Sequence, residues 1–175
     1  MLSIQCNIQQ TNELTHEDVS QLIGLKKIYW PYSEEKQWEW FRTNTKTDDL
    51  HISLSVGGVM IAYLSAQNVE VSIDGRTINS LGIGTVCVDK QYAGNGYGRV
   101  LMSVVNVLVR EKNTIGILVC MDDVVGFYKG AGWRIVNPLR TIVVDSEYDD
   151  NVMIYNPLSI VQNVEIREVT MNRRF

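Results

Sequence analysis

A run of three alternating glycines is the feature of this sequence best suited to chemistry. Gly94, Gly96 and Gly98 follow the apolar run Thr85–Val88 and precede a stretch with helical spacing of apolar residues. Because glycine frees the backbone and a helix N-terminus presents N–H groups, such a loop can bind pyrophosphate through main-chain donors alone. The alternative is a turn that only joins a strand to a helix. The spacing is not GxGxxG and the GK[ST] ending is missing, so neither a dinucleotide site nor an ATP site is indicated.

A second segment, Gly116–Trp133, combines an apolar strand with a short helix. Ile115–Cys120 predicts the strand, and Val124–Lys129 predicts the helix, which carries Tyr128 near its end. Gly130 follows and can terminate the helix. A tyrosine at this place could be a packing aromatic or a proton donor, and its surroundings in the sequence do not decide between the two.

Both segments need a sheet to position them. The hydrophobic patterning predicts strands at Ser3–Ile8, His51–Val56, Val59–Ser65, Arg76–Val88, Ile115–Cys120, Thr141–Val144 and Val152–Tyr155. It predicts four helices: one capped by Thr15 and ended by Pro31, one from Ser33 to about Asn44, one at Tyr97–Lys112 and one at Val124–Lys129. The order βααβββαβαββ predicts an α/β (α+β) fold with a mixed, mostly antiparallel sheet of about seven strands flanked by about four helices. The last residues, 165–175, are expected to form a loose tail.

Together the two segments resemble the acetyl-CoA-binding half of the GNAT superfamily of N-acetyltransferases. That family has a strand, a Q/R-x-x-G-x-G/A loop, a helix, a strand and an F/Y-Y-x-x-x-G-F/W helix in this order. Gly96 and Gly98 fall on the family glycines, while Ala93 replaces the usual Gln or Arg. The resemblance covers about residues 76–157, and the N-terminal part agrees in element order only.

The resemblance implies roles for particular residues. Tyr128 would be the general acid that protonates the departing CoA thiolate. The main chain of the strand would pair with the pantetheine arm, and the loop would bind the pyrophosphate. The cofactor-binding residues are then Val86, Cys87, Val88, Ala93, Gly94, Asn95, Gly96, Tyr97, Gly98 and Arg99.

Within the superfamily, residues 116–133 are most similar to aminoglycoside 2′-N-acetyltransferases, and Glu147–Pro157 is similar to their acidic turn and last strand. Two of their features are absent. Gly84 stands where they carry a glutamate two residues before the Val86 position, and their C-terminal Asp-aromatic-Arg-x-Gly-Asp-x-Trp segment has no match. The general base is therefore not identified.

The acceptor side is expected at about residues 26–45 and 138–157, with residues 1–175 forming one N-acetyltransferase domain whose acetyl-CoA half is about 76–133. An aromatic wall with nearby carboxylates suits a cationic amine. The candidate substrate-binding residues are Trp30, Tyr32, Trp38, Glu147 and Asp149. Packing of the aromatic residues and solvation of the acidic ones are the alternatives.

Composition narrows the class of protein further. The chain of 175 residues is 45% hydrophobic and 21% charged, with a formal charge of -4, which argues weakly against a nucleic-acid groove. Neither a signal peptide nor a membrane span is indicated, so a cytoplasmic location is expected. The three cysteines lack metal-ligand spacing, so buried free thiols and no metal are expected.

The favoured function is an acetyl-CoA-dependent N-acetyltransferase acting on a primary amine of a small molecule, with a homodimer as one possible assembly. Three alternatives stay open: an aminoglycoside 2′-N-acetyltransferase, a peptide or protein N-acetyltransferase, and a non-catalytic acyl-CoA sensor.

Overall fold

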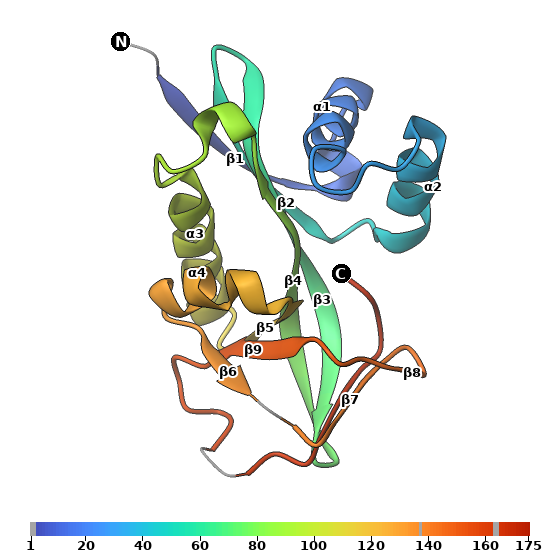
Figure 1. Ribbon diagram of the computed structural model, residues 1–175, viewed down its shortest axis with the longest axis vertical. Helices are drawn as coiled ribbons and strands as arrows, with labels where there is room; N and C mark the ends of the chain where they lie inside the picture. The colour runs from blue at the N-terminus through green and yellow to red at the C-terminus, as the bar shows by residue number, and fades with distance from the viewer. Residues whose placement is uncertain (1–2, 137, 163–164) are drawn as a thin grey trace. The chain divides into compact units, whose positions relative to one another are not determined.

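The computed structural model describes residues 3–136, 138–162 and 165–175, and the chain divides into two compact units. Unit 1 comprises Met1–Gln67 and Gly84–Met102, and unit 2 comprises Asn68–Ile83 and Ser103–Phe175. Three elements contribute residues to both units: β3 (Val59–Ile73), β4 (Arg76–Val88) and α3 (Tyr97–Glu111). β3 and β4 follow each other through the turn at Asp74–Gly75 and form the long hairpin that is visible in Figure 1.

Unit 1 contains the N-terminal strands and two helices. β1 (Ile4–Gln10) pairs antiparallel with β2 (Leu50–Val56), and β2 pairs antiparallel with β3. The β2–β3 turn is Gly57–Gly58, where φ is 58° and 81°, values that glycine adopts without strain.

The two helices of unit 1, α1 (His16–Lys26) and α2 (Glu34–Asn44), begin at side-chain caps. The Thr15 hydroxyl accepts the Asp18 N–H, and the Asp18 carboxylate accepts the Thr15 N–H at 2.8 Å. Ser33 caps α2 by accepting the Lys36 N–H. The apolar faces of both helices pack on Tyr63 and Cys87 through Val19, Leu22, Ile23, Leu25 and Phe41.

Unit 2 contains the C-terminal strands and the short helix α4 (Val125–Gly130). β5 (Gly116–Cys120) pairs in parallel with β4 at Leu81–Gly116 and Gly82–Ile117, and antiparallel with β9 (Asn151–Tyr155). β9 also pairs antiparallel with β6 (Arg134–Val136). The core here consists mostly of Val and Ile residues of the strands.

The chain end is part of the sheet, so the expected loose tail is wrong. β10 (Glu168–Met171) pairs antiparallel with β3 and parallel with β7 (Arg140–Val143). Its Val169 and Met171 are each 1% exposed, because their alternation with polar residues places both on the core face.

Two further expectations differ from the structure. The predicted pair Thr141–Val144 with Val152–Tyr155 does not form: β7 pairs with β10 and with β8 (Ser146–Glu147), whereas β9 lies between β5 and β6. The described residues form ten strands rather than about seven. The predicted element order is confirmed as far as α4, after which the described residues form five strands rather than two. The four helices and the mostly antiparallel mixed sheet are confirmed.

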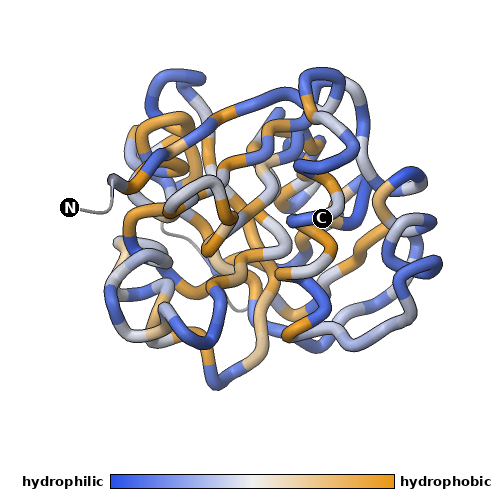
Figure 2. The backbone as a smooth tube through the Cα atoms, turned by 90° about the horizontal axis from the view of Figure 1, so that it is seen from above, coloured by the Kyte–Doolittle hydropathy of each residue, from blue (hydrophilic) through white to orange (hydrophobic). Residues whose placement is uncertain are grey.

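Figure 2 shows hydrophobic stretches alternating with hydrophilic ones along the chain. Over the described residues, no helix combines the length and apolar character required to cross a bilayer. All three cysteines are free thiols: Cys87 and Cys120 are buried as expected, but Cys6 is exposed, so the expectation of a buried thiol is wrong there.

Candidate functional site

The glycine-rich loop of unit 1 is exposed and tightly organised. Ala93, Gly94, Asn95 and Gly96 are all exposed to solvent, and Gly94 and Gly96 have φ of 79° and 87°. The Asn95 side-chain amide donates to the carbonyls of Tyr92 and Ala93 at 3.1 and 3.3 Å. These bonds stabilise the bend of the loop. Both are accepted by carbonyl groups, so they do not use the main-chain N–H groups.

The loop leads directly into α3, whose N-terminus it shapes. The Val100 N–H donates to the Gly96 carbonyl at 3.1 Å, so the amides of Tyr97 and Gly98 precede the first bond of the helix. Such amides, with the positive end of the helix dipole, form an anion site. The predicted residues Ala93–Arg99 therefore lie together, in an arrangement that could bind pyrophosphate.

Strand β4 is strained immediately before the residues expected to pair with pantetheine. Thr85 has φ 51°, a value that is unfavourable for a β-branched residue. Such a residue interrupts a regular strand and re-aims the main chain that follows. Val86 and Val88, the next residues of this strand, are half-buried, whereas Cys87 is 3% exposed and packs into the core of unit 1.

A tyrosine that the sequence analysis did not select contacts this same strand. The Tyr29 hydroxyl donates to the Val88 carbonyl at 2.6 Å, and burial raises the pKa of Tyr29, which keeps the phenol protonated. Tyr29 belongs to the segment between α1 and α2. Its place in the aromatic run Tyr29-Trp30-Pro31-Tyr32 was the available signal, but no sequence rule pairs it with Val88.

Lys26 is a second residue near β4 that the sequence analysis missed. It is 6% exposed, and its Nζ lies 3.0 Å from the centre of the Trp40 ring. Burial lowers the Lys26 pKa to about 8, and burial raises the pKa of the neighbouring Cys87 thiol to about 12. At neutral pH Lys26 is therefore mostly a buried ammonium group near a neutral Cys87 thiol.

The aromatic candidates of the acceptor side also lie in unit 1. Trp30 and Tyr32 are 37% and 61% exposed, and the Trp30 carbonyl accepts the Gln37 amide at 2.6 Å. Trp38 is half-buried and its ring stacks on His16 at 4.8 Å. Trp30 and Tyr32 therefore present exposed rings, whereas Trp38 is partly used in packing.

Tyr128 lies in α4 of unit 2 and is 8% exposed. Its carbonyl accepts the N–H groups of Ala131 and Trp133, and its ring meets Phe127 edge-on at 4.9 Å. The Trp133 indole donates to Asn106 of α3 at 2.9 Å, and Asn106 donates to the Ala131 carbonyl. The helix is thus fixed at its C-terminal turn, which gives Tyr128 a defined position within this unit.

The acidic candidates of unit 2 border a cavity of about 370 Å³ whose lining includes Leu139, Arg140, Glu147 and Asp149. Glu147 already forms an ion pair with Arg140, and both side chains are more than half exposed. Asp149 is exposed. An ion pair of this exposure contributes little stability, so a substrate ammonium group could replace Arg140 as the partner of Glu147.

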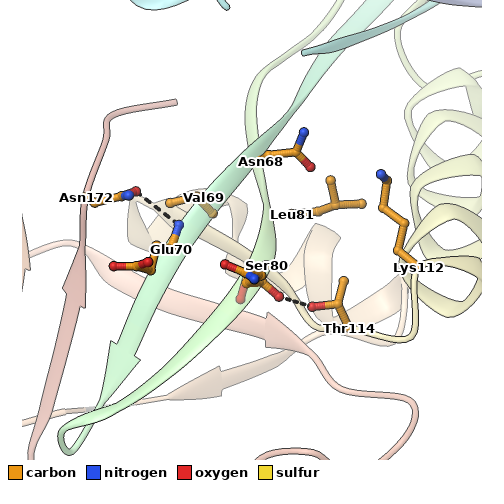
Figure 3. Close-up of a pocket in the computed structure, with 9 residues that line it drawn as sticks. Asn68, Val69, Glu70, Ser80, Leu81, Lys112, Thr114 and Asn172 are labelled. Atoms are coloured by element: carbon orange, nitrogen blue, oxygen red, sulfur yellow. Dashed lines mark hydrogen bonds between the residues drawn. The ribbon is translucent and has the colours of Figure 1, made fainter. Parts of the chain in front are cut away.

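A larger cavity of unit 2, about 510 Å³, is lined by Asn68, Val69, Glu70, Asn79, Ser80, Leu81, Lys112, Thr114 and Asn172. Figure 3 shows Asn172 beside Glu70 on one side and Lys112 with Thr114 on the other. Asn172 accepts the Glu70 N–H at 3.0 Å, and Thr114 donates to the Asn79 carbonyl. None of the residues that line this cavity is among the candidate site residues predicted from the sequence.

Among the described residues, no group of three or more His, Cys, Asp or Glu side chains is placed so that it could hold a metal ion.

Comparison with known proteins gives the family. Residues 10–136 match the family model described as an acetyltransferase (GNAT) domain, which is more than half of the chain. No curated protein matches this sequence. The fold matches the GNAT family N-acetyltransferase YhbS from Escherichia coli in complex with CoA, at TM-score 0.69 and 15% identity, over 98% of this chain and 91% of that one.

Two further solved structures share the fold. An acyl-CoA N-acyltransferase from Pseudomonas aeruginosa matches at TM-score 0.64 and 18% identity, over 87% of this chain and 99% of that one. A GCN5-related N-acetyltransferase from Kribbella flavida matches at TM-score 0.61 and 17% identity over 77% of this chain. This chain covers only 34% of the length of that protein.

The family match, the exposed glycine loop at the start of α3 and the shared fold agree with one another. The chain belongs to the GNAT family of N-acetyltransferases. It is an enzyme of the N-acyltransferase class with the GNAT acyl-CoA N-acyltransferase fold.

Proposed function

We propose that this enzyme uses acetyl-CoA to acetylate a primary amine of a small molecule. The observation that carries the choice of acceptor is the Tyr29–Val88 hydrogen bond. It ties the exposed aromatic segment of Tyr29, Trp30 and Tyr32 to the strand whose main chain would pair with pantetheine. Bulky rings beside that strand favour a compact acceptor over an extended peptide, and their faces suit a cationic amine.

The residues fit acetyl-CoA in two respects. The loop Ala93–Arg99 offers exposed main-chain donors at a helix N-terminus, which suits the pyrophosphate. The strained Thr85 precedes Val86 and Val88, which would pair with the pantetheine arm. Ala93 stands where relatives carry Gln or Arg, and its loss of a polar side chain leaves the backbone donors intact.

Tyr128 is assigned the role of general acid. Transfer requires that the amine be neutral, that the C–S bond break as the C–N bond forms, and that the thiolate receive a proton. A phenol of pKa about 10 protonates a thiolate efficiently only if it is held close and oriented. The anchored α4 turn around Trp133 and Asn106 supports this assignment, because it fixes the backbone of Tyr128.

In this proposal residues 1–175 act as one N-acetyltransferase domain, with about 76–133 binding acetyl-CoA and about 26–45 and 138–157 contributing to acceptor binding. Trp30, Tyr32, Trp38, Glu147 and Asp149 remain the candidate acceptor residues. Exchange of the Arg140 ion pair would free Glu147 for an ammonium group.

The test combines binding and turnover. Thermal unfolding is measured with and without acetyl-CoA, and thiol release is then followed with aminoglycosides, polyamines, amino sugars and a peptide. We expect acetyl-CoA to raise the melting temperature and one small-amine class to drive thiol release. Release with the peptide alone would assign the peptide alternative, and release with aminoglycosides would assign the 2′-N-acetyltransferase alternative.

Two variants test the role of Tyr128. Tyr128→Phe is expected to lower kcat by at least tenfold without changing acetyl-CoA binding. Tyr148→Phe is the comparison: this half-buried tyrosine lines the cavity of Glu147 and Asp149, so its loss of a hydroxyl should change at most the KM for the amine and leave kcat unchanged. Stabilisation by acetyl-CoA without turnover by any amine would favour the sensor alternative.

A further inference from the structure

A chain of hydrogen-bonded polar side chains runs through the buried face of the sheet in unit 1. Thr11 Oγ1 lies 2.9 Å from His51 Nε2, and His51 Nδ1 lies 2.6 Å from the Tyr63 hydroxyl. Ser65 hydrogen-bonds Tyr63 and donates to the Gly84 carbonyl of β4 at 3.1 Å. We call Thr11, His51, Tyr63 and Ser65 the polar chain.

Strand register explains why these residues meet. His51 of β2 is the direct partner of Ser65 of β3, and Ser53 is the partner of Tyr63. Because side chains alternate along a strand, His51, Tyr63 and Ser65 all lie on one face. Each is 2–3% exposed, whereas Thr11 is half-buried. The polar chain therefore leads from a buried end at Gly84 to a more accessible end at Thr11.

Every member of the polar chain is a neutral donor and acceptor at neutral pH. Burial lowers the pKa of His51 to about 4, against the opposing effect of Asp49, and burial raises the pKa of Tyr63 well above its usual value. The charged or titratable groups that face the polar chain are Asp49 beside His51 and Cys87 beside Tyr63. Phe41 of α2 covers His51 with its ring centre at 5.7 Å, and Gln9 of β1 pairs with His51 in the sheet.

A neutral chain of this kind can move a proton without holding a charge. If each hydroxyl and His51 Nε2–H donates toward Thr11, a proton taken up by Ser65 releases the Ser65 proton to Tyr63. The Tyr63 proton then passes to His51 Nδ1, the Nε2 proton passes to Thr11, and Thr11 releases one proton to solvent. The histidine changes tautomer and the polar chain ends in the reverse orientation, with Ser65 donating to Gly84 as observed.

The buried end of the polar chain adjoins a side chain that needs a partner. Gln67 lies two residues beyond Ser65 on the same face of β3, at a strand spacing of about 7 Å. It is 0% exposed, and neither its Oε1 nor its Nε2 has a hydrogen-bond partner among the described residues. A buried amide without partners is unfavourable, so its place indicates a ligand that supplies both a donor and an acceptor.

Gly84 of β4 lies at the buried end of the polar chain. It stands two residues before Val86 and has no side chain that could act as a base. The Ser65 hydroxyl donates to its carbonyl, so the polar chain reaches the main chain of this strand. A base is still required, because an ammonium group cannot attack a thioester.

We propose that the polar chain removes the proton of the acceptor ammonium, carrying it from Ser65 through Tyr63 and His51 to Thr11, while Gln67 binds the acceptor. This deepens the proposed function and rests on it. The proton balance closes. The ammonium loses one proton through the polar chain to solvent, the C–N bond forms as the C–S bond breaks, and the second nitrogen proton ends on the CoA thiol.

The test is the dependence of kcat/KM on pH for an amine that the wild type acetylates. Tyr63→Phe interrupts the polar chain and keeps the ring, so at pH 7 we expect a loss of about a hundredfold. The loss should vanish as the pH passes the pKa of the amine itself, because the substrate then arrives deprotonated. Thr11→Val at the accessible end should give the same profile if Tyr63→Phe fails to fold.

The matched control is Ser53→Ala, a buried serine on the same face that lies outside the polar chain. It should leave the pH profile and acetyl-CoA binding unchanged. A defect in Tyr63→Phe that is equal at every pH, or no defect, overturns the proton path alone. Absence of amine-dependent turnover in the wild type overturns the proposed function, and the proton path with it.

Discussion

The Tyr29 hydroxyl donates to the main-chain carbonyl of Val88 at 2.6 Å, across 59 positions of sequence. This bond joins the aromatic segment after α1 to the strand that we propose pairs with pantetheine. The Tyr29 side chain therefore controls the position of one main-chain carbonyl of that strand.

Replacing Tyr29 with phenylalanine tests this control. Tyr29→Phe keeps the ring but removes the donor, so Val88 loses an acceptor interaction worth about 1 kcal/mol. We expect the dissociation constant for CoA to rise about threefold to tenfold, measured by calorimetry, with little change in melting temperature because the site is exposed. Tyr32→Phe in the same segment is the control, and an equal effect of both variants would contradict the assignment.

The glycine loop makes a second prediction. Gly96 has φ 87°, a conformation that costs a residue with a Cβ about 1–2 kcal/mol. Gly96→Ala should therefore lower stability and reorient the amides before α3, which weakens CoA binding at least tenfold. Gly24→Ala in α1 has open space around its Cβ and should be neutral or stabilising. Unaltered CoA affinity in Gly96→Ala would argue against pyrophosphate binding by this loop.

Most of the correct predictions from the sequence rest on local signals. The helix caps at Thr15 and Ser33, the Gly57–Gly58 turn and the loop before α3 follow from rules that span a few residues, and the structure agrees with them. The C-terminal region was misread because its partners are remote in sequence. Val169 and Met171 alternate as in a strand, but nothing local indicates pairing with β3 and β7.

The buried polar residues were missed for a related reason. His51 alone gives no partner in the sequence, and its role depends on the β2–β3 register that sets it opposite Ser65. The alternation His51/Ser53 on one strand and Tyr63/Ser65 on the next was the available signal. Lys26 and Tyr29 likewise lie near β4 only because α1 packs there. The helical periodicity of the sequence does not predict which strand a helix packs against.

Burial of Lys26 predicts a particular dependence of stability on pH. Its pKa is lowered from 10.5 to about 8, so between these values the unfolded chain binds more protons than the folded one. The free energy of unfolding should therefore rise with pH across that window, by about 3 kcal/mol at most. Below pH 8 the full cost of the buried charge is present.

Lys26→Met is the variant that tests this dependence. It removes the charge but keeps an apolar stem, so it should be more stable than the wild type at pH 7. The difference should shrink as the pH rises from about 8 to 10.5, measured by urea unfolding. The cation–π contact with Trp40 opposes the gain at low pH. Lys27→Met, at an exposed neighbouring site, should show no such trend. A constant difference across the window would contradict the lowered pKa.

The C-terminal residue packs against a glycine in β4, which gives a test of whether the chain end is structural. A Cβ added at Gly82 would lie 2.6 Å from Phe175 Cδ1, and a displaced ring costs about 1–3 kcal/mol. Gly82→Ala should therefore lower the free energy of unfolding. Phe175→Ala should be destabilising by itself, because the half-buried ring packs against the core of unit 2.

The double variant decides whether the two effects are coupled. If the added methyl and the ring compete for one space, Gly82→Ala should cost much less when Phe175 is already alanine. A double-mutant cycle on urea unfolding measures this difference, and residues in contact commonly couple by about 0.5–3 kcal/mol. Gly126→Ala in α4, where a Cβ would meet open space, is the matched glycine control and should show no coupling to Phe175. Strictly additive effects at Gly82 and Phe175 would mean that the ring does not occupy this place in solution. A coupled pair would instead establish that residues beyond β10 contribute to the fold of unit 2, contrary to the tail that their sequence suggests.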